Sequence, residues 1–457
     1  MNEMEKQGFL EKTFKLKEKG GTVNRELIAA FTTFATMSYV LAVQPSAIIG
    51  FTEATFTDIN GLVLTKEAVM IMCALVSGLI TILMGLYANL PFALSTGMGT
   101  NFMFGAMIQT GAISFAGAMT ITLVSGIVFV ILTACGVRDL IVTMIPKNLK
   151  IGIGISVGFY IAYLGFSNSG IGSFVSGISM GDYGDVSIIL ALVGLFLIAA
   201  LEVRKVPGGI LIGVLVVTIL GLFVPTVDQS STVTNIPVLV SVPNLSDVGN
   251  LVFQFDFASL LTWAAIPLIF ISFCGDFFCT LGTILGVAGS VNMLDEDGNL
   301  PEINKPFMVD AIGTTVGSAF GCTTITTFVE SASGVAAGAR TGLSSIVVGI
   351  LFLASTFFAP LFTSIPNCAT GPALIYIGFM MMGSFKDLDF SDYTEYFGVF
   401  VMIMFTAFAG GLAVGISMGI LAHIFIKVVT GQGKDIHVGM YILSIPLIFY
   451  FVANGLM

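Results

Sequence analysis

The sequence predicts an all-α membrane protein that crosses a bilayer about fourteen times. Of its 457 residues, 56% are hydrophobic and only 10% are charged, and the mean hydropathy is +1.01. A soluble chain of this length would carry about a quarter charged residues. Apolar stretches close to the ~20 residues that a helix needs to cross a bilayer recur from residue 27 almost to the C-terminus. The 53 glycines fit this class, because small residues let membrane helices approach closely.

The expected spans are apolar segments separated by polar turns. They lie at residues 27–49, 67–88, 97–112, 116–135, 149–166, 187–203, 208–226, 262–289, 307–322, 325–339, 343–363, 370–384, 395–409 and 411–429. Several are too short to cross alone, which predicts interrupted or half helices. The apolar stretch 438–456 fits either a segment at the membrane interface or an extra span.

The basic residues predict the orientation. With the N-terminus inside, every one of the 17 Lys and Arg residues except Lys66 falls on the inner side. Both termini are therefore expected in the cytoplasm, with the protein in the plasma membrane. Residues 1–26 are charged and amphipathic, and we expect them to lie on the inner membrane face. The net charge of −10 comes mostly from loop acids, and no nucleic-acid partner is expected.

A weak internal repeat suggests two related halves. The segment 145–159 resembles 365–379, and each half has a short, interrupted, Thr/Gly-rich segment third in order, at 91–105 and at 321–335. With an odd number of spans in each half, the two halves insert in opposite orientations. Paired interrupted segments in such an inverted repeat predict a substrate site at the bilayer midplane.

Two acidic residues lie deep in apolar sequence and are candidates for function. Asp276 and Glu330 are flanked by apolar and small residues. A carboxylate at the bilayer centre costs several kcal/mol or more, so such acids usually have a task in transport. The alternative is a protonated or hydrogen-bonded acid that ties helices together.

Asn101 is a third candidate because it follows the glycines of the first interrupted segment. The β-branched run 323–327 precedes Glu330 in the second interrupted segment and favours a strand. We expect the two extended segments to pair their backbones and to direct two helix N-termini at a shared cavity. Asn101 has the alternative role of a helix cap.

No cofactor or metal centre is expected. The six cysteines contain no C-x-x-C pair and lie almost entirely in apolar runs, which is typical of free, buried thiols. The two histidines are both near the C-terminus, away from the candidate acids.

Four motifs resemble those of a known family. They are residues 33–40 (TFATMSYV), 97–101 (GMGTN), 276–283 (DFFCTLGT) and 329–342 (VESASGVAAGARTG). Together they resemble the azaguanine-like purine permeases, the adenine/guanine/hypoxanthine branch of the nucleobase–cation symporters. The resemblance runs from about Asn24 to the C-terminus. The chain departs from the family pattern at Gln44-Pro45, at Ser95-Thr96 and at Cys279, where the family usually has a second Asp.

The resemblance implies the uracil-permease fold, with two inverted repeats of seven spans and short extended segments before the half helices of spans 3 and 10. It divides the chain into an N-terminal segment (1–26), a core domain (27–140 and 262–363), a gate domain (146–226 and 366–430), an extracellular loop (227–260) and a C-terminal apolar segment (431–457). It also implies that Asp276, Glu330 and Asn101 match the substrate and coupling positions. To the expected substrate site we add Gly99 and Phe277 from these motifs, and Thr327 from the β-branched run before Glu330.

These features predict a transporter that imports purine bases by proton symport with elevator-like alternating access, and not an enzyme. Glu330 would accept N–H bonds from the base, while Asp276, with Glu330, would serve proton coupling. Sodium coupling and a homodimer remain open. One alternative is an anion exchanger of the sulfate-transporter type, although Glu330 would repel an anion. The other is an intramembrane aspartyl enzyme, which needs two acids that share a proton; we expect no second Asp beside Asp276.

Overall fold

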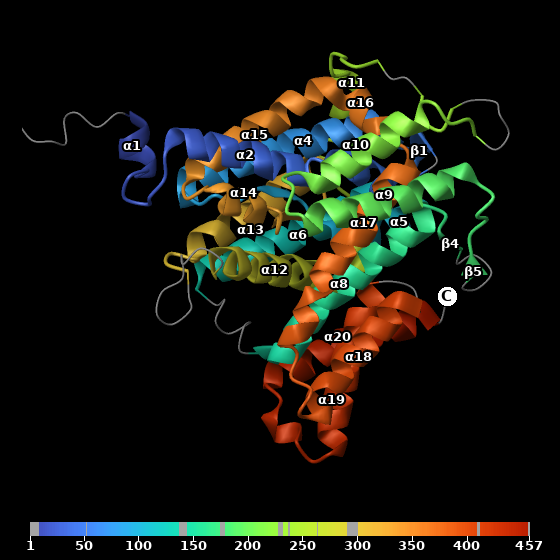
Figure 1. The fold of residues 1–457 in the computed structure, drawn as a ribbon. Helices are drawn as coiled ribbons and strands as arrows, with labels where there is room; N and C mark the ends of the chain where they lie inside the picture. The colour runs from blue at the N-terminus through green and yellow to red at the C-terminus, as the bar shows by residue number, and fades with distance from the viewer. Residues whose placement is uncertain are drawn as a thin grey trace, which may run out of the picture.

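The computed structural model describes residues 9–51, 53–136, 144–173, 179–226, 232–235, 238–262, 264–289, 300–408 and 412–455. Its regular structure is almost entirely helical (Figure 1). The first half contains α1 (Phe9–Phe14), α2 (Val23–Met37), α3 (Val40–Ile49), α4 (Lys66–Leu83), α5 (Met98–Gln109), α6 (Phe115–Ala134), α8 (Lys147–Asn168), α9 (Val186–Val203) and α10 (Gly209–Gly221). The second half contains α11 (Leu245–Gly249), α12 (Ala265–Gly289), α13 (Asn304–Ala319), α14 (Ser331–Ala337), α15 (Gly342–Ser355), α16 (Ala359–Thr363), α17 (Asn367–Met381), α18 (Tyr393–Phe408), α19 (Leu412–Val429) and α20 (Val438–Gly455).

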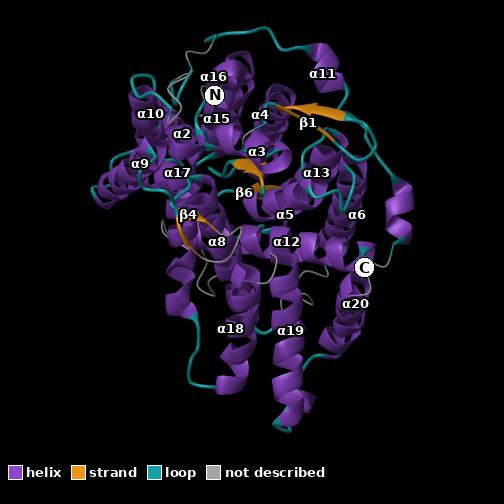
Figure 2. Ribbon diagram, turned by 90° about the vertical axis from the view of Figure 1, so that its right-hand side faces the viewer, coloured by secondary structure: helices purple, strands orange, loops and turns teal. Residues whose placement is uncertain are grey.

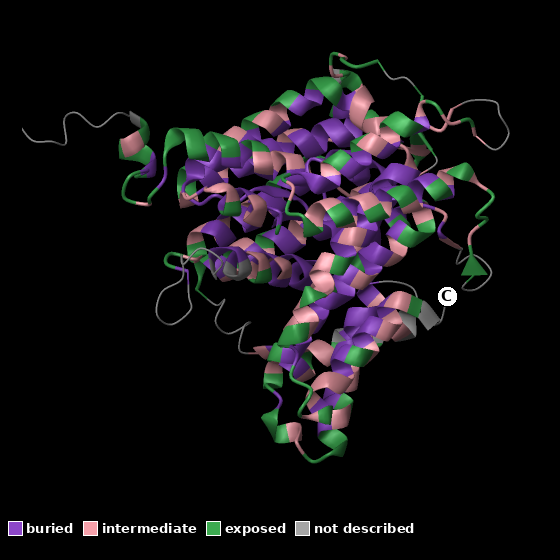
Figure 3. Ribbon diagram, viewed as in Figure 1, coloured by how far each residue is buried: buried purple, intermediate pink, exposed green. Residues whose placement is uncertain are grey.

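The helices match a membrane protein in length and composition. Among the described residues, nine helical segments are long and apolar enough to cross a membrane, and α10 and α18 are shorter apolar helices. The prediction of a helical polytopic membrane protein is confirmed at this level. The exposed faces are rich in apolar side chains such as Phe196 and Phe223, which suits contact with lipid. Figure 3 shows the buried residues concentrated inside the helical body.

Polar caps mark where several helices begin. The side-chain oxygens of Thr22, Thr65 and Ser114 accept backbone N–H bonds at the first turns of α2, α4 and α6. These bonds satisfy donors that have no partner within the helix. A different boundary separates α2 from α3, where the helix is interrupted at Ser38 and Tyr39 although both residues remain buried.

Two strands meet inside the helical body, as the sequence predicted. Strand β3 (Leu94–Thr96) pairs antiparallel with β6 (Ile325–Thr327), with Ser95 opposite Thr326. All six residues are buried, so the pairing satisfies backbone groups that could not reach water. Figure 2 shows β6 within the body of helices. The other two-stranded sheets, β1 (Thr55–Thr57) with β2 (Val63–Thr65) and β4 (Gly172–Ser173) with β5 (Ser179–Met180), lie in connections between helices.

Glycines bring the backbones of neighbouring helices together. A Cβ on Gly78 of α4 would lie 2.8 Å from the carbonyl oxygen of Gly349 in α15. A Cβ on Gly165 of α8 would lie 2.7 Å from the carbonyl oxygen of Gly371 in α17. No side chain fits at these crossings, which confirms that small residues support close helix packing here.

The two ends of the chain pack differently. Helix α1 has six residues. Its last residue, Phe14, and the following Leu16 pack against Leu343 and Ile346 of α15. These two apolar side chains contact the protein, whereas Leu10 of α1 is exposed, and the position of residues 1–26 on the inner membrane face stays a prediction. At the other end, α18 and α19 lie side by side and extend from the body, and α20 packs against α12 and α19 (Figures 1 and 2).

Candidate functional site

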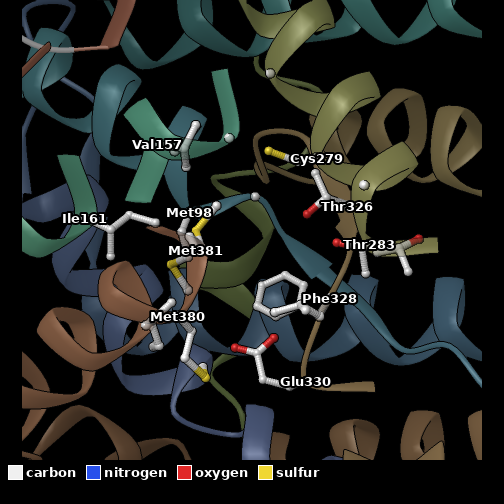
Figure 4. A pocket seen from close by; sticks show the side chains of 18 of the residues that line it. Met98, Val157, Ile161, Cys279, Thr283, Thr326, Phe328, Glu330, Met380 and Met381 are labelled. Atoms are coloured by element: carbon white, nitrogen blue, oxygen red, sulfur yellow. The ribbon is translucent and has the colours of Figure 1, made fainter. Parts of the chain in front are cut away.

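A cavity of about 480 Å³ lies at the junction of two groups of helices (Figure 4). One wall comes from α12, the start of α5, and the segment from β6 into α14. The other wall comes from α8, α9, α10, α17 and α19. The first group belongs to the expected core domain and the second to the expected gate domain.

Glu330 reaches this cavity from the junction between β6 and α14. Its side chain lines the cavity and is only 7% exposed. The hydroxyl of Tyr39, at the interruption between α2 and α3, donates a 2.8 Å hydrogen bond to Oε1 of Glu330. A hydrogen bond to a charged acceptor is about twice as strong as a neutral one, so Tyr39 holds this carboxylate in place. Tyr39 was not among the predicted site residues.

Asp276 lines the same cavity from α12. Its Oδ2 accepts a 2.6 Å hydrogen bond from the hydroxyl of Thr314 in α13. Its Oδ1 is buried and has no hydrogen-bond partner among the described residues. The structure thus brings Asp276 and Glu330 to one cavity, although the two acids come from different elements.

The structure adds a second buried acid, Asp310, that the sequence analysis missed. Asp310 in α13 is fully buried and interacts directly with Asp276. Thr280 donates a 2.9 Å hydrogen bond to Oδ2 of Asp310. Helices α12 and α13 thus each present an Asp with a Thr four residues later on the same face. The Thr of each helix donates a hydrogen bond to the Asp of the other helix.

This pair corrects the expectation that no second Asp lies beside Asp276. Asp310 was passed over because it lies near the start of the predicted span 307–322, where acids are usually assigned to the helix end. In the structure α13 begins at Asn304, so Asp310 lies well inside the helix. The signal that could have identified it is the apolar sequence on both sides, Val309 before it and Ala311 after it.

Three of the remaining predicted residues, Gly99, Thr327 and Asn101, lie at the cavity or are buried in α5. Gly99 and Thr327 line the cavity. Asn101 is fully buried in the first turns of α5, where Oδ1 accepts a hydrogen bond from Thr323, and its Nδ2 has no partner among the described residues. The N-cap of α5 is Gly97, so Asn101 is not the cap.

Phe277, which was expected at the substrate, does not line the cavity. The side chain of Phe277 is 1% exposed and packs among aromatic rings. Its ring centroid lies 5.0 Å from that of Phe278 and 5.2 Å from that of Phe307. Its neighbour Phe278 faces the cavity instead. Consecutive residues of a helix point about 100° apart, and the sequence alone did not set the rotation of α12.

The rest of the cavity surface is mainly apolar. Figure 4 shows Phe328 next to Glu330, with Met98, Met380 and Met381 on the side away from Cys279. Such a surface can hold a flat, weakly polar ring, because methionine and aromatic side chains adapt to its faces. Within the described part of the chain, His, Cys, Asp and Glu form no group of three that could hold a metal ion. Chemically, the site offers carboxylate acceptors inside an apolar chamber.

Known proteins match the chain over nearly its whole length. The model of the xanthine/uracil Permease family matches residues 24–418. A putative permease of Methanocaldococcus jannaschii is 36% identical over 447 residues, covering 97% of this chain and 98% of the relative. The adenine permease AdeQ of Escherichia coli K12 is 32% identical, and the match covers 96% of this chain and 95% of AdeQ. The guanine/hypoxanthine permease GhxP of Escherichia coli O157:H7 is 31% identical, and the match covers 98% of this chain and 97% of GhxP.

Solved transporter structures share the fold. The structure of SLC26A9 superimposes with a TM-score of 0.61 at 12% identity, covering 92% of this chain and 67% of that one. The transmembrane domain of the cyanobacterial bicarbonate transporter BicA superimposes with a TM-score of 0.58 at 15% identity. The match covers 89% of this chain and 97% of that one. At these identities the likeness concerns architecture alone, whereas the sequence matches define kinship: the chain belongs to the xanthine/uracil family of membrane permeases.

Proposed function

We propose that this permease carries purine bases across the plasma membrane by binding them at Glu330. The observation that carries the proposal is the Glu330 carboxylate, held by Tyr39 at the wall of an apolar cavity of about 480 Å³. Ligand pockets for small molecules are typically about 300–1,000 Å³ and mostly apolar, with a few placed polar groups. A purine is planar and offers ring N–H donors that an ionised carboxylate accepts strongly. Relatives named as adenine and guanine/hypoxanthine permeases support the same substrate class.

Coupling to protons is the second part of the proposal. Asp276 carries the proton, and Asp310 assists it, because two adjacent carboxyl groups in an apolar site do not both ionise readily. Asp276 suits the task because it lines the cavity and its carboxyl group lies against that of Asp310. Its charge state can therefore respond to the substrate next to it.

We further propose an elevator-like transport cycle, which the distribution of the cavity residues over the helices supports. Glu330 and Asp276 both lie on the expected core domain, and the opposite wall belongs to the expected gate domain. The core would move as an elevator and carry both acids with the base. We assign about fourteen spans in two inverted repeats, with both termini in the cytoplasm. Spin labels on α6 of the core and α10 of the gate test the elevator movement. The distance between the two labels should change when a purine and a proton gradient are present.

An anion exchanger is the alternative that the shared fold with a bicarbonate transporter raises. The cavity favours the purine instead, because three carboxylic acids line it (Glu202, Asp276 and Glu330) and no Lys, Arg or His does so among the described residues. An anion would enter this site against like charges. The Asp276–Asp310 pair is what an aspartyl enzyme would need, but the chain belongs to a permease family.

A labelled uptake panel tests the proposal. Cells that lack their own purine transporters would express the protein and receive labelled adenine, guanine, hypoxanthine, xanthine or uracil, with and without a protonophore. We expect uptake of at least one of adenine, guanine and hypoxanthine, and loss of accumulation with the protonophore. Absence of purine uptake by well-expressed protein would refute the substrate class, and protonophore-resistant accumulation would refute proton coupling alone.

A further inference from the structure

Within the described ranges, one ionisable side chain reaches the cavity from the gate side. The gate wall, defined as the cavity-lining residues of α8, α9, α10, α17, α19 and the short helix Met382–Asp387 after α17, is apolar except for Glu202 and Ser384. Glu202 lies in the last turn of α9. A carboxylate near a helix C-terminus is unfavourable to that helix, because the negative end of the helix dipole lies there. The dipole of α9 therefore does not favour an acid at this position.

The carboxylate of Glu202 lies over the beginning of α10, where the positive end of that helix dipole favours an acid. A Cβ on Gly209 would be 2.7 Å from Oε1 of Glu202, and the backbone amide of Ile210 lies close to the carboxylate. Oε1 is buried and has no hydrogen-bond partner in the described part of the chain. The same turn contacts the core, since a Cβ on Gly208 would be 3.1 Å from Cβ of Ala35 in α2. Glu202 therefore lies at the boundary between gate and core.

Glu202 and Glu330 line the cavity from opposite walls and are close enough to interact electrostatically. The basic residues Arg204 and Lys205, which follow Glu202 in the sequence, are exposed. Neither they nor any other cation forms an ion pair with Glu202 among the described residues. A ligand bound to Glu330 thus has a second carboxylate on the facing wall, without a cation to offset it.

We propose that Glu202 is a specificity-determining residue that excludes ionised oxopurines and admits neutral purine bases. A neutral base bound at Glu330 can turn a second N–H toward Glu202. An oxopurine that has lost a ring proton is an anion, and it would lie between two carboxylates. Charges of the same sign in a poorly hydrated cavity repel more strongly than in water, so the second carboxylate raises selectivity. The inference rests on the proposed function, because it concerns the same purine site.

Competition during hypoxanthine uptake tests this role. Unlabelled urate, an anion at neutral pH, and unlabelled hypoxanthine would compete with labelled hypoxanthine in cells expressing the wild type, Glu202→Gln or Glu202→Asp. We expect the ratio of the inhibition constant of urate to that of hypoxanthine to fall about tenfold in Glu202→Gln, the change given by ~1.4 kcal/mol of lost repulsion. Glu202→Asp keeps the charge and should keep the wild-type ratio.

A matched control removes one negative charge elsewhere. Glu302 forms an exposed ion pair with Lys305 away from the cavity, so Glu302→Gln should leave the ratio unchanged. If Glu202→Gln does not transport, calorimetric titration of the purified variant with urate and hypoxanthine gives the same ratio from binding. An unchanged ratio in Glu202→Gln overturns the inference. A wild type that takes up no purine overturns the proposed function instead.

Discussion

Tyr39 and Glu330 are 291 positions apart in the chain, yet the Tyr39 hydroxyl donates a 2.8 Å hydrogen bond to Oε1 of Glu330. The bond joins the interruption between α2 and α3 to the segment that follows β6. A second contact supports the junction, because the hydroxyls of Thr36 and Ser333 are 2.8 Å apart and Ser333 also donates to the Glu330 carbonyl oxygen at 2.7 Å. Glu330 is thus held at its side chain and at its backbone before any ligand binds.

Replacing Tyr39 by Phe should weaken purine binding. The change removes the hydroxyl and leaves Oε1 of Glu330 without its donor, whereas the ring remains to fill the space. A hydrogen bond to a charged group contributes ~1.5–3 kcal/mol. The bond already exists before the base binds, so this figure is an upper limit on the loss, and we expect a dissociation constant up to about tenfold higher. Calorimetric titration of purified protein with the best-transported purine measures it. Tyr393→Phe, which alters an exposed ring outside the cavity, is the control. Equal affinities for wild type and Tyr39→Phe would show that the bond does not support the site.

Glu330→Gln should abolish high-affinity binding. An amide is a weaker acceptor than a carboxylate, and its NH₂ group would face the N–H donors of the base. Leaving a buried N–H of the ligand without a partner costs ~1–3 kcal/mol, which is about one to two decades in affinity. The same titration measures this loss, and thermal unfolding confirms that the variant is folded. Unchanged affinity would remove Glu330 from the substrate site.

Asp276→Asn should separate binding from accumulation. An amide imitates the protonated acid permanently, so the variant should bind purine within about a decade of the wild type while losing proton-driven accumulation. Exchange between labelled and unlabelled purine in proteoliposomes should persist, because it needs no net proton movement. Asp310→Asn provides the comparison and should impair accumulation as well. Accumulation by Asp276→Asn that a protonophore still abolishes would move the coupling role to another acid.

Cys279→Asp should change the pH dependence of uptake. Cys279 lines the cavity on α12, one turn after Asp276, and interacts electrostatically with both Asp276 and Asp310. A third carboxyl group in this cluster would make the acids titrate together and shift the pH optimum. Uptake from pH 5 to 9 in Cys279→Asp and in Cys279→Ser separates the charge from the loss of the thiol. A profile that matches the wild type would mean that the cluster does not control coupling.

Gly105→Ala should destabilise the fold without touching the cavity. A Cβ at this position of α5 would collide with the carbonyl oxygen of Ala47 in α3. Overpacking of this kind costs ~1–3 kcal/mol, so the temperature of thermal unfolding in detergent should fall. Gly249→Ala at the end of α11 is the control, because a Cβ there meets nothing within 4 Å and Gly249 does not line the cavity. An unfolding temperature equal to the wild type would show that α3 and α5 separate easily.

The sequence alone determined the apolar segments, the two extended segments and two of the acids in the cavity. Each of these is local. A membrane helix must be apolar over about 20 residues, and a carboxylate inside such a run is visible in the sequence itself. The pairing of β3 with β6 was also predictable, because unpaired backbone inside a bilayer must find partners.

Only the tertiary structure decided which side chains share the cavity. The contacts of Tyr39 with Glu330 and of Thr280 with Asp310 join residues from different helices. They depend on the rotation and crossing of helices, which packing sets and hydropathy does not record. For the same reason Phe277 packs among aromatic rings, and Glu202, which resembles an ordinary helix-end acid in the sequence, lies opposite Glu330.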